Sequence, residues 1–210
     1  LQDLGGNQPM LRLLQGDVGS GKTAVAILAM ANTADSGYQV AFIAPSEVLA
    51  HQHFQTVVAS LGNFFSIGLL TRTQQFLSEP GKGIKKIGKK QLAKALASGQ
   101  CLIVIGTQAL LQESVDFYKL GLLIVDEQHR FGVEQRQLLL NKKLFTEDSK
   151  NLIAHFLAMT ATPIPRSLAL SLYGDLNLSV IKTMPPGRLP VITKIVEDEG
   201  RDKMYKFIRQ

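Results

Sequence analysis

The sequence predicts an α/β fold, a mostly parallel β-sheet with helices on both faces. Two observations predict it. Short apolar runs of strand length alternate along the chain with longer segments of helical periodicity, the pattern of strand–helix–strand units. A glycine-rich stretch, Gly16–Thr23, lies between the first apolar run and the first helical segment. With 210 residues, 45% of them hydrophobic, the chain is long enough to bury one large core.

Each element is expected from its own pattern. The expected strands are the short apolar runs Arg12–Gln15, Gln39–Ile43, Ser66–Leu70, Cys101–Ile105, Leu122–Val125, Phe156–Met159 and Leu176–Ile181. The expected helices are Lys22–Asn32, Glu47–Ser60, Ile84–Ala97, Val133–Leu140 and Arg166–Leu172. In a parallel sheet of this kind, ligands collect at the carboxyl ends of the strands, so the segments that follow each strand should share one working edge.

Two clusters of proline and glycine divide the chain. Glu79–Gly83 predicts a mobile loop, and Met184–Arg188 predicts an exit from the first domain. After the exit, Val191–Val196 has the pattern of a strand and Asp202–Arg209 that of a helix. Because the chain also lacks an initiator Met, we expect it to be a piece of a longer protein.

The charge leaves two interpretations of one basic stretch open. The net charge is +6 at pH 7, which permits a polyanionic partner without demanding one. Much of the excess is carried by Lys82, Lys85, Lys86, Lys89, Lys90 and Lys94. These lysines form either a solvated helix face preceded by a flexible loop or a nucleic-acid contact surface.

Composition also bounds the compartment. The single cysteine, Cys101, lies beside an apolar run, so we expect a buried thiol rather than a disulfide or a nucleophile. The chain contains no run long enough to cross a bilayer and no visible secretory signal. We therefore expect a cytoplasmic protein from a reducing compartment, with no membrane partner.

The glycine-rich stretch matches G-x-x-x-x-G-K-[ST], the phosphate-binding P-loop, at every position. Glycines let successive N–H groups point at phosphate oxygens, and the following helix presents its positive dipole end to the same anion. Lys22 is expected to reach the β- and γ-phosphates of ATP, and the Thr23 hydroxyl to ligate Mg²⁺. The expected cofactor-binding residues are Gly16, Asp17, Val18, Gly19, Ser20, Gly21, Lys22 and Thr23.

An acidic pair follows the apolar run Leu122–Val125. A P-loop enzyme needs a carboxylate at the end of a neighbouring strand, so we expect Asp126 to hold Mg²⁺ and Glu127 to orient or deprotonate the attacking water. His129 would lie within reach of the γ-phosphate side. The predicted catalytic residues are thus Lys22, Asp126, Glu127 and His129, and the predicted metal ligands are Thr23 and Asp126.

At Ile124–Val133, IVDEQHRFGV, the chain resembles the first motor domain of superfamily-two DNA helicases and translocases. Within that superfamily the resemblance is to the RecG family of branch-migrating DNA helicases. The other similar segments are Gly16–Thr23, Ile105–Leu110, Met159–Arg166, Tyr173–Leu176 and Pro185–Arg188. The resemblance extends from Leu11 to Arg188 and implies a RecA-like P-loop NTPase fold.

The resemblance also implies roles for residues at the strand ends. Pro45, Ser46 and Glu47 correspond to a segment that grips the DNA backbone, and Gly106 and Thr107 correspond to a second backbone contact. The segment that links nucleotide state to DNA grip corresponds to Thr160, Ala161, Thr162 and Arg166. Because such contacts carry no base information, sequence-independent binding of branched double-stranded DNA is implied.

Further domains are implied as partners. Residues 1–183 correspond to the helicase ATP-binding domain, and residues 184–210 to the linker and the beginning of the second motor domain. That second motor domain, which supplies arginine fingers, and an upstream wedge domain would belong to the same polypeptide. The chain alone would then bind nucleotide but turn it over weakly or not at all. The loop through Lys82 is longer than is usual in the family.

Three functions remain in competition. The first is an ATP-dependent DNA helicase that remodels stalled forks and Holliday junctions in recombination and repair. The second is the translocase motor of a transcription-repair coupling factor, which typically has Glu where this chain has Gln128. The third is a nucleotide-gated binding module without catalysis, against which the presence of Lys22 and Glu127 argues. Gln128 and Pro185–Arg188 favour the first.

Overall fold

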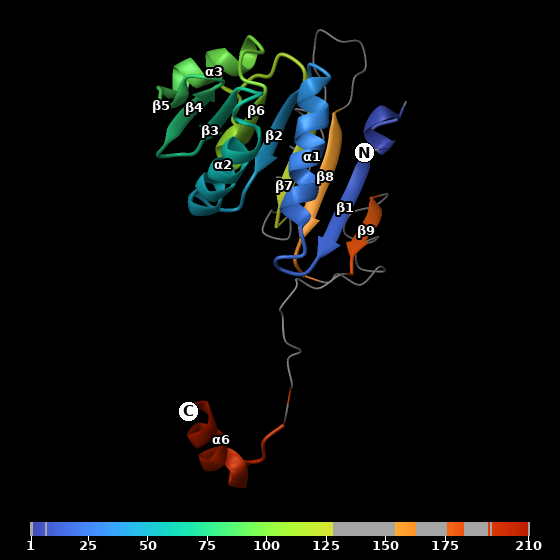
Figure 1. Cartoon of the computed structure of the whole chain (residues 1–210), viewed down its shortest axis with the longest axis vertical. Coiled ribbons are helices and arrows are strands. Elements are labelled where there is room, and N and C mark those ends of the chain that lie inside the picture. The colour runs from blue at the N-terminus through green and yellow to red at the C-terminus, as the bar shows by residue number, and fades with distance from the viewer. Residues whose placement is uncertain are drawn as a thin grey trace.

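The computed structural model describes residues 2–6, 8–127, 154–162, 176–182, 193 and 195–209 (Figure 1). Within these ranges the strands form one sheet in the order β5-β4-β3-β6-β2-β7-β8-β1-β9. The strands are β1 Leu11–Gly16, β2 Gln39–Ile43, β3 Ile67–Leu70, β4 Gln75–Glu79, β5 Gly83–Lys86, β6 Ile103–Gly106, β7 Leu120–Asp126, β8 His155–Thr160 and β9 Asn177–Ile181. The helices are α1 Lys22–Asp35, α2 Glu47–Leu61, α3 Lys89–Ala97 and α6 Arg201–Ile208, with 3-10 turns η1 Gln2–Gly5, η2 Gln108–Leu111 and η4 Asp198–Gly200.

Seven of these strands run parallel. β1 pairs with β8 and β9, β2 with β6 and β7, β3 with β6, and β7 with β8. The carboxyl ends of neighbouring strands lie at similar heights in the sheet, because Ile43 is opposite both Gly106 and Val125, and Gln15 is opposite Thr160. The carboxyl ends of the central strands therefore meet at one side of the sheet, which we call the carboxyl edge.

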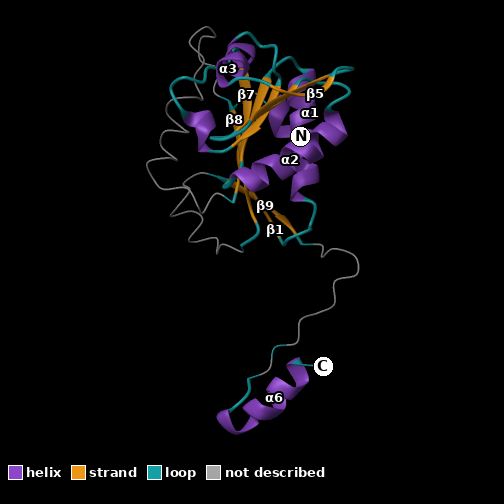
Figure 2. Cartoon of the chain, turned by 90° about the vertical axis from the view of Figure 1, so that its left-hand side faces the viewer, coloured by secondary structure: helices purple, strands orange, loops and turns teal. Residues whose placement is uncertain are grey.

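Helices cover both faces of the sheet (Figure 2). One core cluster joins Phe42 of β2 to Met30 of α1 and Phe54 of α2. The opposite cluster joins Ile43 of β2 to Leu92 of α3 and Leu110 of η2. All five residues of β2 are buried, as is typical of a parallel strand covered on both faces. The predicted fold class is thus confirmed.

Gln39 joins three elements at the end of the sheet opposite the carboxyl edge. Its side chain is buried, and its amide nitrogen donates to the carbonyl oxygens of Leu96 (2.9 Å) and Cys101 (2.8 Å). Its amide oxygen accepts from the N–H of Lys119 at 2.9 Å. Cys101 is itself fully buried, and burial raises the pKa of its thiol to about 12. The prediction of a buried core thiol is confirmed.

The sequence prediction was wrong around residues 75–88. The residues from Ile84 onward were expected to be one helix, but β4 and β5 form an antiparallel hairpin there and α3 begins only at Lys89. Pro80 and Gly81 lie within a tight turn in which the N–H of Lys82 donates to Glu79 and Gly81 has φ 73°. That is the type II pattern of proline followed by glycine, and it brings β5 back along β4. The expected mobile loop is this turn.

The carboxyl-terminal residues agree with the sequence only in part. Helix α6 forms where a helix was expected, and none of its residues is buried. Thr193, Ile195 and Val196, from the expected strand, have no strand conformation. The expected helices Val133–Leu140 and Arg166–Leu172 and the exit at Met184–Arg188 lie outside the described residues, so the division at residue 184 stays a prediction.

No helix in the described ranges combines the length and the apolar character needed to span a bilayer.

Candidate functional site

The glycine-rich loop connects β1 to α1 at the carboxyl edge. Gly19 (φ 78°) and Gly21 (φ 95°) adopt left-handed backbone conformations that favour glycine. Gly16 is required for a different reason, because a Cβ there would lie 2.5 Å from the Ser20 hydroxyl oxygen. Helix α1 begins with Gly21 as its N-cap, without a side-chain cap and without an acidic residue in its first turn. Its first amides can therefore bind an external anion.

Lys22 closes over this loop. Its ammonium nitrogen donates to the carbonyl oxygens of Gly16 at 2.7 Å and of Asp17 at 2.9 Å. The Ser20 hydroxyl oxygen, by contrast, is buried and has no hydrogen-bond partner among the residues that the structure describes. A buried hydroxyl of this kind is costly unless a ligand satisfies it. Cation, free hydroxyl and helix terminus together fit a polyphosphate.

The acidic pair lies two strands from the loop. In the register of the sheet, Asp126 is opposite Met159 of β8, and the neighbouring Thr160 is opposite Gln15 of β1. Two strand spacings separate β7 from β1, about 10 Å, so a polyphosphate with its metal can bridge them. The first residue of the predicted pair is thus brought to the phosphate loop.

Asp126 is held from two sides. Its Oδ1 accepts from the backbone N–H of Glu127 at 3.1 Å, and its Oδ2 lies 3.0 Å from Nε2 of His53. Both side chains of the second contact are largely buried, at 13% exposure for Asp126 and 14% for His53. His53 could not be identified from the sequence pattern. A pattern of helical residues shows which face is apolar, but not which polar side chain reaches a neighbouring strand end.

Glu127 has an unusual backbone conformation. Its φ is 49°, and among the described residues it is the only non-glycine residue with a positive φ. Such conformations cost about 1–3 kcal/mol and are concentrated at functional sites. The conformation turns the chain sharply at the end of β7, next to Asp126.

The metal donors suit Mg²⁺. The described residues include no group of three or more acidic, histidine or cysteine side chains able to hold a metal alone. Mg²⁺ characteristically takes one or two protein oxygens together with substrate phosphates and waters. The Asp126 carboxylate and the Thr23 hydroxyl would provide that partial set.

The start of α2 lies at the same edge. Ser46 is its N-cap, with Oγ accepting from the N–H of Leu49 at 3.3 Å. The carboxylate of Glu47 accepts from the hydroxyl of Thr73, and this hydrogen bond lowers the pKa of Glu47. Of the predicted DNA-gripping residues, Glu47 therefore fastens the loop after β3 to α2, and Pro45 and Ser46 lead into the helix terminus.

Gly106 and Thr107 follow β6. A Cβ at Gly106 would lie 2.2 Å from the carbonyl oxygen of Leu70. The need for glycine therefore has an internal cause, besides the DNA-backbone contact that the family resemblance implies at this position. Thr107 donates its N–H to Leu70 at 3.3 Å, and its hydroxyl accepts from Ala109 at 3.5 Å to cap η2.

The segment Thr160–Thr162 follows β8. The hydroxyls of Thr160 and Thr162 lie 2.9 Å apart, and the N–H of Thr162 donates to the Thr160 hydroxyl at 3.2 Å. These contacts make a local hydroxyl-capped turn with Ala161 at its centre. Gln128, His129 and Arg166 lie outside the described residues.

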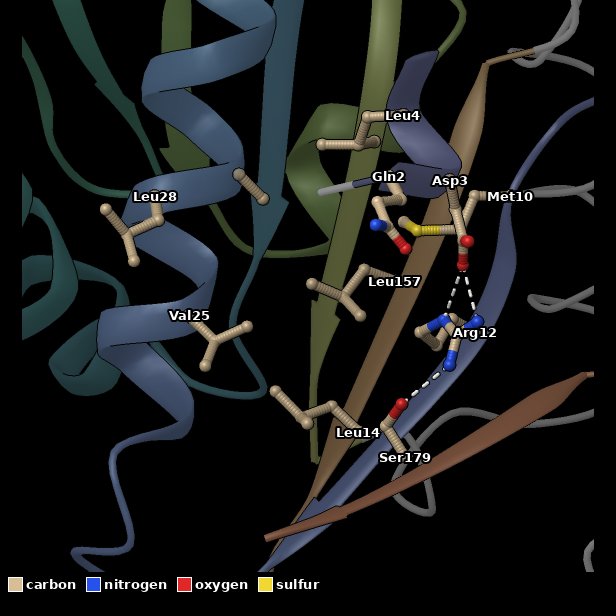
Figure 3. A pocket seen from close by; sticks show the side chains of 11 residues that line it. Gln2, Asp3, Leu4, Met10, Arg12, Leu14, Val25, Leu28, Leu157 and Ser179 are labelled. Carbon is tan, nitrogen blue, oxygen red and sulfur yellow. Dashed lines mark hydrogen bonds and ion pairs between the residues drawn. The ribbon is translucent and has the colours of Figure 1, made fainter. Parts of the chain in front are cut away.

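A separate hollow of about 520 Å³ lies between α1, η1, β1 and β9 (Figure 3). Val25 and Leu28 of α1 face Leu14 and Leu157 across it, and Arg12 spans from Asp3 (2.9 Å from Nε) to Ser179 (2.6 Å). None of the predicted site residues lines it. It is thus a feature of the α1 face rather than of the carboxyl edge.

The chain is similar in sequence to known proteins. The chain is 46% identical over 211 residues to the ATP-dependent DNA helicase RecG of Aquifex aeolicus, covering 100% of this chain and 25% of that protein. It is 49% identical over 199 residues to RecG of Mycobacterium tuberculosis, covering 92% of this chain and 26% of that protein. The chain spans about a quarter of the length of these curated relatives. The expected resemblance to RecG is confirmed.

Solved structures agree. A structure of RecG bound to a three-way DNA junction is 41% identical to this chain, with a TM-score of 0.74. The match covers 100% of this chain and 26% of the RecG chain in that structure. A DEAD box protein from Methanococcus jannaschii, at 21% identity and a TM-score of 0.56 over 82% of this chain and 46% of that one, shares the fold. The DEAD/DEAH box helicase family matches residues 7–170. That match covers most of the sequence and includes both the phosphate loop and the acidic strand end, so the chain belongs to the DEAD/DEAH box helicase family.

Proposed function

We propose that this chain is the nucleotide-binding motor half of an ATP-dependent DNA helicase that remodels branched DNA, such as stalled forks and Holliday junctions. The main observation in support is the structural similarity to RecG bound to a three-way DNA junction. That similarity extends over the whole chain. Curated relatives that are RecG helicases, at 44–49% identity, support this function over the coupling-factor alternative. A cytosolic location in a bacterium follows from the same proposal.

Nucleotide binding would use the elements around the phosphate loop. Lys22 would exchange its two loop carbonyls for phosphate oxygens, and the Ser20 hydroxyl would gain a partner. Thr23 and Asp126 would hold Mg²⁺, which when bound neutralises charge on the phosphoryl oxygens. Glu127 would orient the attacking water and accept its proton, with His129 on the same side.

DNA binding would use the loops of the carboxyl edge. The N-terminus of α2 at Pro45–Glu47 and the hydroxyl of Thr107 offer hydrogen bonds to phosphates, which fix position on the duplex without reading bases. Thr160, Ala161, Thr162 and Arg166 would link these contacts to the nucleotide. The partner surface is the second motor domain of the same polypeptide, which would supply the catalytic arginines, together with an upstream wedge domain.

The test is steady-state ATP hydrolysis by the intact protein and by this chain, with and without a three-way junction, beside a nucleotide titration. We expect junction-stimulated hydrolysis by the intact protein, and nucleotide binding with negligible turnover by the chain. Robust turnover by the chain alone would contradict the requirement for a second motor domain. Hydrolysis by the intact protein that does not respond to any DNA would contradict the helicase function.

A further inference from the structure

His53 joins two parts of the carboxyl edge that the proposed function treats separately. It lies on α2, the helix whose N-terminus carries Ser46, and its Nε2 is 3.0 Å from Oδ2 of Asp126 at the end of β7. The contact crosses 73 residues of sequence. A single hydrogen bond therefore connects a helix proposed to contact DNA with a carboxylate proposed to hold the metal.

The position of His53 is fixed by packing. Its ring lies against Phe42 of β2, with 4.6 Å between ring centroids and 52° between planes. On the same helix, Ala50, Phe54 and Val57 are buried in the core. Because close-packed side chains keep their rotamers, the imidazole has little freedom to leave Asp126.

The hydrogen bond constrains how Asp126 presents its oxygens. Oδ2 faces His53 and Oδ1 faces the N–H of Glu127, which sets the rotation of the carboxylate. A carboxylate has about four lone-pair sites, so each oxygen retains one for a metal ion or a metal-bound water. Partners of this kind, which orient a metal ligand, commonly change metal affinity by about 10–100-fold.

Helix α2 also extends to the DNA side. Ser46 precedes His53 by seven residues, a rise of about 10 Å along the helix axis. We propose that His53 is a positioning residue that orients Asp126 for Mg²⁺-nucleotide and couples that orientation to DNA contact at the start of α2. This inference rests on the proposed function of both sites, and no described contact offers Asp126 a second side-chain donor in place of His53.

The competing explanation is that His53 only fills space against Phe42. Four variants of the intact protein separate the two roles. His53→Leu keeps an apolar contact with Phe42 and removes the donor, and His53→Gln keeps a donor near the position of Nε2. His53→Asn has the same amide on a shorter side chain that does not reach Asp126. His51→Gln is the matched control, since His51 lies on the same helix and packs instead against Phe54 and Phe76.

The experiment is a titration of a fluorescent ATP analogue with Mg²⁺ or with EDTA, each with and without a three-way junction. For His53→Leu and His53→Asn we expect the Kd with Mg²⁺ to rise about tenfold. The Kd in EDTA should change by less than about twofold, because there is then no metal to orient. In the same two variants, the junction should no longer lower the Kd for the nucleotide. His53→Gln and His51→Gln should behave as wild type.

Several outcomes would overturn the inference. One such outcome is that Mg²⁺ increases nucleotide affinity in His53→Leu as much as it does in the wild-type protein. That result, or equal nucleotide Kd values for the Gln and Asn variants, shows that the imidazole only fills space. Should the leucine variant unfold, which a thermal melt reveals, the Gln and Asn pair decides alone. A junction that leaves the nucleotide Kd of the wild-type protein unchanged would overturn the coupling to DNA contact. If the wild-type protein binds no nucleotide at all, the proposed function fails instead, and that result is distinct.

Discussion

The ammonium nitrogen of Lys22 lies 2.7 Å from the carbonyl oxygen of Gly16, so the seventh residue of the phosphate loop is tied to the first. The lysine thereby neutralises part of the loop's own carbonyl dipoles and keeps its charge at the position where phosphate oxygens would bind. These two hydrogen bonds hold the loop in its closed conformation, and a phosphate ligand must replace them when it binds Lys22.

Replacing Lys22 with alanine should lower nucleotide affinity. The variant loses the cation that would face the β- and γ-phosphates, and we expect Kd to rise at least about tenfold, since a charge-assisted hydrogen bond contributes roughly 1.5–3 kcal/mol. Fluorescent-nucleotide titration of the intact protein measures this. Lys119→Ala, at the opposite edge of the sheet, is the control. Equal affinities for Lys22→Ala and wild type would remove the loop from the nucleotide site.

Glu127→Gln should separate binding from hydrolysis. The amide keeps the size of the side chain but cannot accept a proton from water, so we expect kcat to fall by about 10²–10⁴-fold with nucleotide affinity retained. Glu113→Gln, an exposed acid near η2, is the control. Single-turnover measurements report the chemical step directly, and normal turnover in the variant would assign the base elsewhere.

The basic stretch should contribute to DNA binding at one end only. Lys86 lies opposite Phe76 near the start of β4, and Lys89 begins α3 and donates to Gln112 at 2.6 Å, so both lie toward the carboxyl edge. Lysines on β5 also shield an exposed edge strand, which is the alternative role.

A charge-matched pair of double variants distinguishes these roles. Lys86→Gln with Lys89→Gln should weaken junction binding and reduce the salt dependence of log K by about 0.9 per lost phosphate contact. Lys82→Gln with Lys119→Gln, at the amino end of the sheet, should leave both unchanged. Identical salt slopes for the two double variants would mean that Lys86 and Lys89 only shield the edge.

Stability should decline below neutral pH because of His155. Its Nδ1 accepts from the N–H of Met10 at 2.9 Å, and burial lowers the pKa of His155, opposed by the charge of Asp3. Because the folded pKa lies below the unfolded value of 6.5, the unfolded chain binds the proton first. The stabilisation is thus complete above pH 6.5 and is lost as the pH falls through the folded pKa.

Urea unfolding of the chain at pH 7.5 and pH 5.5 measures this effect. In His155→Asn the amide oxygen can still accept from Met10 but does not titrate, so its midpoint should decrease less than that of wild type between the two pH values. A decrease of equal size in both proteins would show that other groups cause the pH dependence.

The sequence predicted the central elements because their signals are local. Buried parallel strands such as β2 are continuous apolar runs, and the expected limits Gln39–Ile43 are those observed. The glycine loop has a fixed spacing, and Asp126 follows its strand directly. The β4–β5 hairpin could not be predicted in this way, because Gly83–Lys86 is exposed and has few apolar residues. Its strand conformation depends on pairing with β4, which is a tertiary contact.

The sequence also could not predict which neighbour a given polar side chain contacts. Nothing local distinguishes His51 from His53, although the second faces Asp126 and the first packs against Phe54 and Phe76. The same holds for Gly106, whose small size is required by the carbonyl of Leu70 on the neighbouring strand. Such roles depend on the register between strands far apart in the chain.

The turn at Glu79–Lys82 is a suitable site for attaching a label. It closes the hairpin at the amino end of the parallel strands. β4 and β5 are the outermost strands on one side of the sheet, far from β1 in the strand order. Exposed turns of this kind tolerate insertion. A dye or affinity tag placed between Gly81 and Lys82 should therefore report on conformational changes from a site remote from both the phosphate loop and the acidic strand end, and should leave both unperturbed.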